Sequence, residues 1–272
     1  MLITVDIGNT CVKAGIFSPK GTRKVTSNSI PKGNQVSEEF IQNLIQWEAL
    51  SKEEKSSPLS WYVAQTGSFS WKKIEAEIRQ IRPQDRFRML THDHIPINID
   101  ADFPEKVGLD RLLAAVGAID MYGDTPMLVV DAGTAITIDV VQNMTFCGGA
   151  ILPGLGVMNE SYPRISKKLP KVQFSREFIM KTATPGKNTE DAIRNGCYWG
   201  ATATIRLFYE MFFTRRQKVL LLITGGDGEF LVPGLIRVLA GVQVAKQFKY
   251  HPALVLEGIN VCAHYIGDHL AR

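Results

Sequence analysis

The chain has 272 residues, of which 45% are hydrophobic and 21% charged, the composition of a soluble globular protein. This length allows one large domain or two smaller ones. The formal net charge of +4 arises from 31 basic and 27 acidic residues, a weak bias that suits an anionic ligand such as a nucleotide. The densest basic run, Thr214–Lys218, is predicted to be the charged end of a helix, and no run predicts nucleic-acid binding.

The cysteines and the N-terminus indicate the compartment. Four scattered cysteines lack CxxC pairs and nearby histidines, so we expect no disulfide framework and no zinc site: Cys11, Cys147, Cys197 and Cys262. The N-terminus carries Asp6 and no basic segment followed by an apolar stretch, so we expect no signal peptide. The longest apolar run, Val219–Ile223, has the length of a strand and not of a membrane span. We therefore expect a cytoplasmic protein without a membrane or nucleic-acid partner.

The first part of the chain alternates short apolar strands with amphipathic helices. A turn at Gly8–Asn9 separates the first two strands, and serines are the expected N-caps of two helices. In order, the expected elements are strands at Leu2–Val5 and Lys13–Phe17, a helix from Ser37 to Leu50, a polar surface loop at Lys52–Pro58, a strand at Trp61–Ala64, and a helix from Ser70 whose Ile74, Ile78 and Ile81 recur at helical spacing.

The second part of the chain repeats this alternation. A glycine at position 123 ends one helix, Asn188 or Thr189 caps a long one, and Pro252 precedes the last one. In order, the expected elements are a helix at Leu109–Met121, strands at Met127–Val130 and Ala135–Val141, a helix from Glu190 to Phe213, a strand at Val219–Ile223 and a helix at Ala253–Leu270. Strands and helices mixed in this order predict an α/β fold.

One internal similarity suggests how these elements are organised. The segment Leu2–Thr10 resembles Met127–Thr134, because each is an apolar strand followed by Asp-x-Gly and then a threonine, with a second β-rich segment after it. A similarity at this separation favours two related lobes that each begin with strand, turn and strand. The alternative is two unrelated hairpins that both use Asp and Gly because turns favour these residues.

The two Asp-x-Gly turns have the chemistry of a phosphate site. Backbone amides next to a glycine can bind phosphate oxygens, and a carboxylate at a strand end, such as Asp6, can hold Mg²⁺ through water. Lys13 adds a positive charge near the first turn, and Asp131–Thr134 forms the second turn. Neither is a Walker A loop or a dinucleotide fingerprint. A third glycine segment, Ile223–Gly228, offers flat backbone to an adenine or a ribose, although an ordinary turn between strand and helix is the alternative.

Two Asp-x-Gly phosphate loops followed by a late Gly-Gly loop resemble the acetate/sugar kinase–Hsp70–actin superfamily. Within it, Gly108–Arg111 is similar to the GxDR motif of type III pantothenate kinases. Further matches follow in the order of that family and cover nearly the whole chain: Asp6–Thr10 with Lys13, Asp131–Thr134, Gly148–Gly154 and Gly186–Thr189.

The resemblance implies an α/β fold of two related actin-like (ribonuclease H-like) lobes with mixed β-sheets and ATP in the cleft between them. We expect the N-terminal lobe at residues 1–115 and the C-terminal lobe at 116–272, with the final helix free to pack on the first lobe. The implied reaction is the ATP-dependent phosphorylation of pantothenate to 4′-phosphopantothenate, the first step of coenzyme A biosynthesis. The implied partners are pantothenate, ATP and a second copy of the chain in a homodimer.

The resemblance also assigns roles to individual residues. It makes Asp110 the catalytic residue, and it implies a Mg²⁺ ion held through water by Asp6 and a monovalent cation, K⁺ or NH₄⁺, at Asp131. The residues implied for ATP binding are Asp6, Ile7, Gly8, Asn9, Thr10, Cys11, Val12, Lys13 and Thr134, and those implied for substrate binding are Gly108, Leu109, Asp110, Arg111 and Thr189.

The chemistry of Asp110 and Arg111 can also be argued from the residues themselves. A kinase needs an acceptor for the proton of the substrate hydroxyl, and a carboxylate beside the γ-phosphate serves. Pantothenate has a primary hydroxyl and a carboxylate, which an acid and an adjacent arginine suit. The alternatives are a stabilising charge at a helix N-terminus for Asp110, a salt-bridge partner for Arg111, and simple helix capping for Thr189.

One position departs from the family pattern. Family members often carry an aromatic residue, commonly Tyr, nine positions before the GxDR aspartate, where it lines the pantothenate pocket. Here Ala101 occupies that position, and Phe103 follows two residues later. Either Phe103 replaces the aromatic ring from a shifted loop or the pocket is differently lined.

Two further patterns each allow a purely structural interpretation and a functional one. Small residues at four-residue spacing, Gly196, Gly200 and Thr204, predict close helix approach, either at a dimer interface or in ordinary core packing. The segment His92–His94 is predicted to be a surface loop and not a metal site.

Two rival functions are a kinase of another small hydroxylated substrate and a nucleotide-binding regulator that has lost catalysis. An actin-like filament former is the weakest rival.

Overall fold

The computed structural model describes residues 1–18, 23–25, 30–31, 50–67, 70–175, 185–213, 218–239 and 248–270. The chain divides into two compact units. Unit 1 contains Met1–Asn98, Asp102–Met121 and Ala253–Arg272, and unit 2 contains Ile99–Ala101 and Tyr122–Pro252. The helix expected from Ser37 lies outside the described residues except for its last residue.

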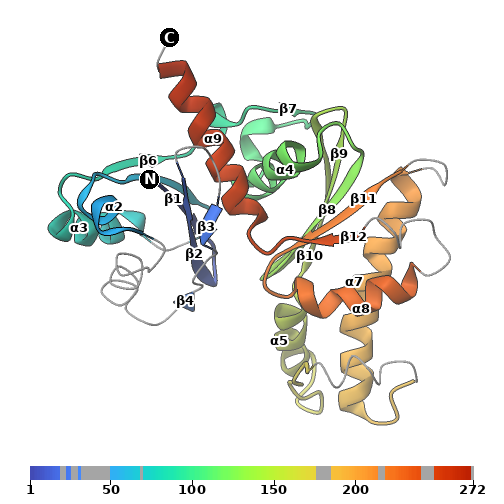
Figure 1. The fold of residues 1–272 in the computed structure, drawn as a ribbon. Helices are drawn as coiled ribbons and strands as arrows, with labels where there is room; N and C mark the ends of the chain where they lie inside the picture. Colours follow the sequence, from blue (N-terminus) through green and yellow to red (C-terminus); the bar gives the residue numbers. More distant parts are fainter. Residues whose placement is uncertain are drawn as a thin grey trace. The chain divides into compact units, whose positions relative to one another are not determined.

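Unit 1 is built on a mixed sheet with the strand order β3-β2-β1-β5-β6, in which β4 also pairs with β2 (Figure 1). Strand β2 runs antiparallel to β1, whereas β5 and β6 run parallel to it. Its strands are β1 (Leu2–Ile7), β2 (Cys11–Phe17), β3 (Arg23–Val25), β4 (Ile30–Pro31), β5 (Ser60–Gln65) and β6 (Arg86–Met89). Every residue of β1 is buried, which fits the apolar side chains of Leu2, Ile3, Val5 and Ile7 on its two faces.

The helices of unit 1 correct two of the sequence predictions. They are α2 (Lys52–Ser56), α3 (Trp71–Ile81), η1 (His92–His94), η2 (Pro104–Lys106), α4 (Leu109–Tyr122) and α9 (Leu254–Leu270). The loop predicted at Lys52–Pro58 contains the short helix α2, which begins with a capping box between Ser51 and Glu54. Ser70 stands at the N-cap of α3 without a capping hydrogen bond, and Ile81 is 54% exposed.

Helices α4 and α9 meet through glycines. A Cβ atom at Gly258 would overlap the carbonyl group of Leu113, and one at Gly117 would lie 2.6 Å from the carbonyl oxygen of Leu254. The two backbones therefore approach more closely than larger residues would allow. Since α9 also contacts β1, β2 and β5, it packs on the sheet of unit 1.

Unit 2 is built on a sheet with the strand order β12-β11-β8-β9-β10-β7. Its elements are β7 (Asn98–Ile99, shared with the end of unit 1), β8 (Met127–Ala132), β9 (Ala135–Gln142), β10 (Thr145–Pro153), α5 (Leu155–Ile165), α7 (Thr189–Phe212), β11 (Leu220–Thr224), α8 (Gly228–Val238) and β12 (Phe248–Tyr250). The prediction lacked β10, whose register is interrupted between Phe146 and Gly149. A Cβ at Gly149 would overlap the Ile138 carbonyl group, so a glycine is needed inside this strand.

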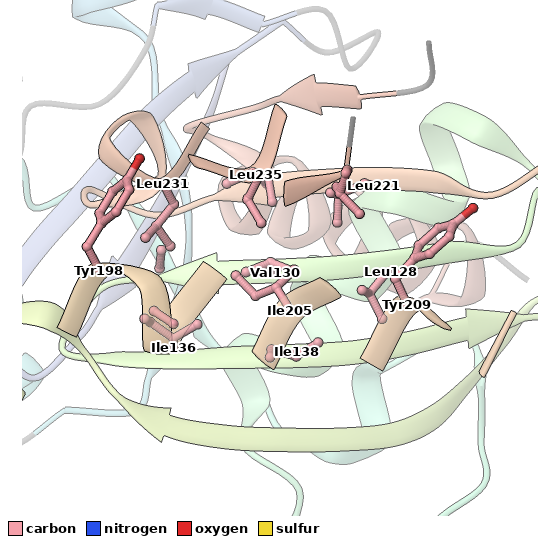
Figure 2. Packing of buried hydrophobic residues seen from close by; sticks show 14 of the residues in the cluster. Leu128, Val130, Ile136, Ile138, Tyr198, Ile205, Tyr209, Leu221, Leu231 and Leu235 are labelled. Atoms are coloured by element: carbon pink, nitrogen blue, oxygen red, sulfur yellow. The ribbon is translucent and has the colours of Figure 1, made fainter. Parts of the chain in front are cut away.

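The core of unit 2 lies between its sheet and two helices. Helices α7 and α8 also pack on each other. Figure 2 shows apolar side chains of these helices gathered over the central strands, and its labelled residues are Leu128, Val130, Ile136, Ile138, Tyr198, Ile205, Tyr209, Leu221, Leu231 and Leu235. Burial raises the pKa of Tyr198 to about 12. No helix in the described ranges is both long and apolar enough to cross a membrane.

The two sheets share one topology, which confirms the prediction of two related lobes. In each sheet a central strand, β1 or β8, pairs antiparallel with the strand that follows it and parallel with a later strand, β5 or β11. A further parallel strand, β6 or β12, lies beyond. The predicted division after residue 115 falls within α4, whereas unit 1 extends to Met121 and includes α9.

Candidate active site

The first Asp-x-Gly turn connects β1 to β2 and exposes its tip. The backbone N–H of Gly8 donates to the carbonyl oxygen of Cys11 at 3.0 Å, and Asn9 and Thr10 are exposed. The side chains of Ile7 and Val12 belong to the core of unit 1. These two residues can therefore offer a ligand only their main chain.

Asp6 and Lys13 lie directly opposite each other on β1 and β2. Opposite residues of an antiparallel pair project from the same face of the sheet, with Cβ atoms about 5 Å apart. Asp6 is only 8% exposed, and Lys13 is partly buried. The strand pairing thus brings together the carboxylate and the cation that the sequence singled out.

A third segment, which the sequence analysis did not include, supports this turn. After β5, the backbone N–H groups of Thr66 and Gly67 both donate to the carbonyl oxygen of Ile7, at 3.0 and 2.8 Å. A Cβ atom at Gly67 would overlap the backbone of Gly8. The only signal in the sequence is a glycine three residues after the end of the predicted strand, which permits close backbone approach but does not indicate which segment it contacts.

The GxDR segment forms the start of α4. The carbonyl oxygen of Gly108 accepts from the N–H groups of Arg111 and Leu112, at 3.1 and 3.2 Å. A carboxylate oxygen of Asp110 accepts from the Arg111 N–H at 2.9 Å, and a Cβ at Gly108 would lie 2.6 Å from the same oxygen. Asp110 and Arg111 are both partly buried, whereas Leu109 is buried at 8% exposure. The segment therefore holds the carboxylate of Asp110 next to the guanidinium of Arg111. Gly108, which has no side chain, leaves space for the carboxylate.

The second Asp-x-Gly turn, in unit 2, lies against two other loops. Asp131 is partly buried near the end of β8, and Thr134 is exposed in the turn. The N–H of Gly154 donates to the carbonyl oxygen of Thr134 at 2.9 Å, and a Cβ at Gly154 would overlap the carbonyl oxygen of Gly133. Because α5 begins immediately after Gly154, a helix N-terminus adjoins this turn.

The Gly-Gly segment is the third loop of this cluster. Gly225 has a φ of +87°, and a Cβ there would lie 2.4 Å from a carboxylate oxygen of Asp131. The N–H of Asp227 donates to the carbonyl oxygen of Ala132 at 2.9 Å. Asp227 precedes α8 without a side-chain capping bond, and burial raises the pKa of its carboxyl group. Gly225 and Asp227 thus bring the loop after β11 against the second Asp-x-Gly turn.

The loop before α7 carries Thr189. The side chain of Asn188 accepts from the N–H of Asp191 at 2.9 Å and caps the helix, so capping does not depend on Thr189, which is exposed at the first helical position. The ring of Phe103 is 58% exposed and lies 4.2 Å from the Lys106 ammonium, whereas Ala101 is partly buried.

The two units hold different parts of the predicted site. In unit 1, Asp6 and Lys13 face one another, and Asp110 and Arg111 are adjacent in α4. In unit 2, Asp131, Thr134 and the Gly-Gly segment form one cluster, and Thr189 lies on a separate loop. Among the described residues, no group of three or more His, Cys, Asp or Glu side chains is arranged to hold a metal ion.

Comparison with known proteins identifies the family. The sequence profile of the type III pantothenate kinase family matches residues 2–211. A type III pantothenate kinase from Persephonella marina is 30% identical over 241 residues, which are 86% of this chain and 91% of the relative. One from Rhodopirellula baltica is 35% identical over 152 residues, which are 55% of this chain and 54% of that relative.

A solved structure has the same fold. Component A of the (R)-2-hydroxyglutaryl-CoA dehydratase from Acidaminococcus fermentans superposes with a TM-score of 0.57 at 14% sequence identity, and the superposition covers 100% of this chain and 99% of that one. At this identity the likeness concerns the fold alone. Together with the profile match over most of the chain and the motifs that the structure presents in two related lobes, it leads to one conclusion: the chain belongs to the type III pantothenate kinase family, the phosphotransferases that act on pantothenate in coenzyme A biosynthesis.

Proposed function

We propose that Asp110 accepts the proton of the pantothenate primary hydroxyl while this kinase transfers the γ-phosphoryl group of ATP to it. The observation that carries the proposal is the position of Asp110. Its carboxylate is partly buried at the start of α4, aligned by the Arg111 N–H and given space by Gly108. A carboxylate held in this way is suited to orient a hydroxyl for in-line attack.

We propose that both Asp-x-Gly turns bind the phosphates of ATP. Gly8 and Gly133 donate their own N–H groups within the turns, to the carbonyl oxygens of Cys11 and Ala135. The exposed residues that follow these glycines are therefore the proposed phosphate contacts, and Lys13 and Thr134 add a cation and a hydroxyl. The backbone of Gly225 and Gly226 is suited to the nucleoside, because Gly226 is exposed with open space where a Cβ would stand. Gly225 beside it lies close to a carboxylate oxygen of Asp131. Arg111 is the proposed partner of the pantothenate carboxylate.

We infer that Thr189 and Phe103 each contact pantothenate. The Thr189 hydroxyl is not needed as the cap of α7 and is exposed. Many family members carry an aromatic residue at the position of Ala101, and Phe103 presents an exposed aromatic ring two residues later. The ring and the hydroxyl suit the apolar and polar parts of pantothenate respectively.

The available donors fit the cations that a kinase of this family implies. Carboxylate and carbonyl oxygens are the ligands that Mg²⁺ and monovalent cations prefer, and Asp6 and Asp131 supply carboxylates at the two phosphate turns. We propose that Asp6 holds Mg²⁺ through water and that Asp131 binds K⁺ or NH₄⁺. When bound, these cations would neutralise phosphate charge, and the carboxylates of Asp6 and Asp131 would hold them in position.

We further infer a homodimer in the cytoplasm. The small-residue row of α7 is not core packing: Gly196 and Gly200 are exposed, and Leu207 and Met211 extend the row at 53% and 64% exposure. A cavity of about 320 Å³ lies beside it, lined by Val140, Gln142, Cys147, Gly148, Gly149, Phe208 and Phe212. An apolar face of this kind favours association, and four cysteines without disulfides suit a reducing compartment.

The test is phosphoryl transfer from ATP to pantothenate by the purified protein, with and without K⁺. We expect K⁺-dependent formation of 4′-phosphopantothenate. The substitution Asp110→Asn is expected to lower kcat by about 10²–10⁴-fold, because a general base is removed. Asp120→Asn, an exposed position of the same helix, is the control and should leave kcat unchanged.

Two results would contradict the proposal. Normal turnover by the Asp110→Asn variant would remove Asp110 from catalysis. Preference for a sugar, acetate or pantoate over pantothenate, measured in the same assay, would place this chain with kinases of another substrate.

A further inference from the structure

The turn η1 (His92–His94) contacts the segment that precedes the GxDR motif. Within the turn, the N–H of Thr91 donates to Nδ1 of His94 at 3.0 Å, and the N–H of Ile95 donates to the carbonyl oxygen of His92 at 3.1 Å. The His92 ring points elsewhere: its Nε2 lies 2.7 Å from the carbonyl oxygen of Val107, fifteen residues along the chain. The interaction therefore joins two separate segments of unit 1.

Val107 lies between an exposed segment that contains η2 and the start of α4. The five residues from Asp102 to Lys106 are all exposed, while Leu109 and Leu112 are buried. The next residue, Gly108, accepts the first hydrogen bonds of the helix. The path of the chain into α4 is thus held on one side by core packing and on the other by the bond from His92.

The atoms of this bond determine its chemistry. A carbonyl oxygen only accepts, so Nε2 of His92 must carry the hydrogen, which it does both in the neutral tautomer protonated at Nε2 and in the imidazolium ion. The bond therefore persists whether or not the ring is charged. The turn itself has a second support, because α9 packs against η1.

We propose that His92 is a positioning residue for Asp110. By holding the Val107 carbonyl group, it sets where α4 begins and so where the Asp110 carboxylate lies. The inference rests on the proposed role of Asp110 as proton acceptor. A misplacement of a catalytic group by about 1 Å can cost about 10²-fold in rate, which makes one such bond important for turnover.

The experiment compares His92→Leu with His92→Gln in the full chain. Leucine removes the donor at similar volume, and glutamine places an amide N–H near the position of Nε2. We expect His92→Leu to lower kcat by about 10–100-fold with little change in the KM for ATP, and His92→Gln to recover most of the loss. Asp93→Asn, an exposed position of the same turn, is the control.

A double-mutant cycle with Asp110→Asn separates positioning from general destabilisation. If His92 acts through Asp110, adding His92→Leu to Asp110→Asn should lower kcat no further. Additive losses would overturn the proposal, as would a normal kcat for His92→Leu. If His92→Leu fails to fold, a His92→Gln variant with wild-type melting temperature and the full loss of kcat would also overturn it.

The cycle also distinguishes the two proposals from each other. Normal turnover by Asp110→Asn contradicts the proposed function itself, whatever His92 does. A strong effect of Asp110→Asn together with normal turnover by His92→Leu leaves the proposed function intact and overturns only the positioning role.

Discussion

Asp110 and Asp227 are acidic residues at the N-terminal ends of two helices, yet their surroundings differ. Asp110 accepts a hydrogen bond from the backbone of its own helix. Asp227 makes no capping bond to α8, and burial raises the pKa of its carboxyl group. A carboxylate kept partly out of water without a capping bond destabilises the fold when it is ionised.

Replacing Asp227 by Asn is expected to stabilise the protein at neutral pH. Because the folded pKa is raised, the native state binds the proton more tightly than the unfolded chain, so wild-type stability falls as the pH rises through that pKa. The gain from Asp227→Asn should therefore be small in acid and reach up to about 1 kcal/mol at pH 7, since solvent screens a partly exposed carboxylate. Urea unfolding at several pH values measures it, and equal gains at all pH values would contradict this explanation.

Individual site residues were predictable to different degrees. The sequence was enough to single out Asp6, Asp131 and Asp110, because each is a carboxylate next to or near a glycine in a recognisable motif. The contact of Gly67 and the proposed positioning role of His92 were not predictable in this way, because each depends on backbone that is distant in the sequence. Such contacts depend on strand and helix placement, which no local pattern contains.

At the scale of elements, the contact between α4 and α9 depends on Gly258. A Cβ atom there would overlap the Leu113 carbonyl group, so Gly258→Ala is expected to lower the free energy of unfolding by about 1–3 kcal/mol. Gly267→Ala is the matched control on the same helix, since nothing lies within 4 Å of that site and alanine favours helix by up to about 1 kcal/mol. Chemical denaturation compares them, and equal effects would show that the crossing tolerates a side chain.

The exposed row on α7 makes a prediction about assembly. A charge buried in an apolar interface is costly, so Leu207→Glu should convert a dimer to a monomer. Ile236→Glu on α8, at a position of similar exposure, should leave the assembly unchanged. Sedimentation of the wild type and both variants measures this. A monomeric wild-type protein would rule out the proposed homodimer.

The short helix α2 shows why some elements escaped prediction. Its five residues bury no side chain, so it has no apolar periodicity to detect. It is held from a distance by Arg82, which donates to the Ser57 carbonyl oxygen at 2.7 Å and to that of Lys55. Arg82 is itself buried against Asp85 at 2.7 Å. In contrast, long amphipathic helices such as α7 carry their pattern in their own sequence.

At the scale of the molecule, each unit has its own sheet and its own hydrophobic core. We therefore expect calorimetry to resolve two unfolding transitions. Gly258→Ala should lower only the transition of unit 1, by about 2–4 °C for each kcal/mol. A single transition that moves as a whole would show that the two units unfold together.

The two-lobe fold was predictable because the duplicated strand, turn and strand carry the same signal twice. The extent of each lobe was harder to foresee, since the boundary lies inside continuous helical sequence near Met121. The return of α9 to the first unit depends on the glycine contacts with α4, which become visible only once both helices are placed.

The return of α9 has a consequence for synthesis on the ribosome. Residues Tyr122–Pro252 are contiguous, so that lobe can complete its core as soon as it leaves the exit tunnel. The lobe that is translated first must wait, because its core lacks α9, which is translated after the whole of the other lobe. We therefore expect unit 2 to finish folding before unit 1. The strands of unit 1 are accessible to chaperones in the interval.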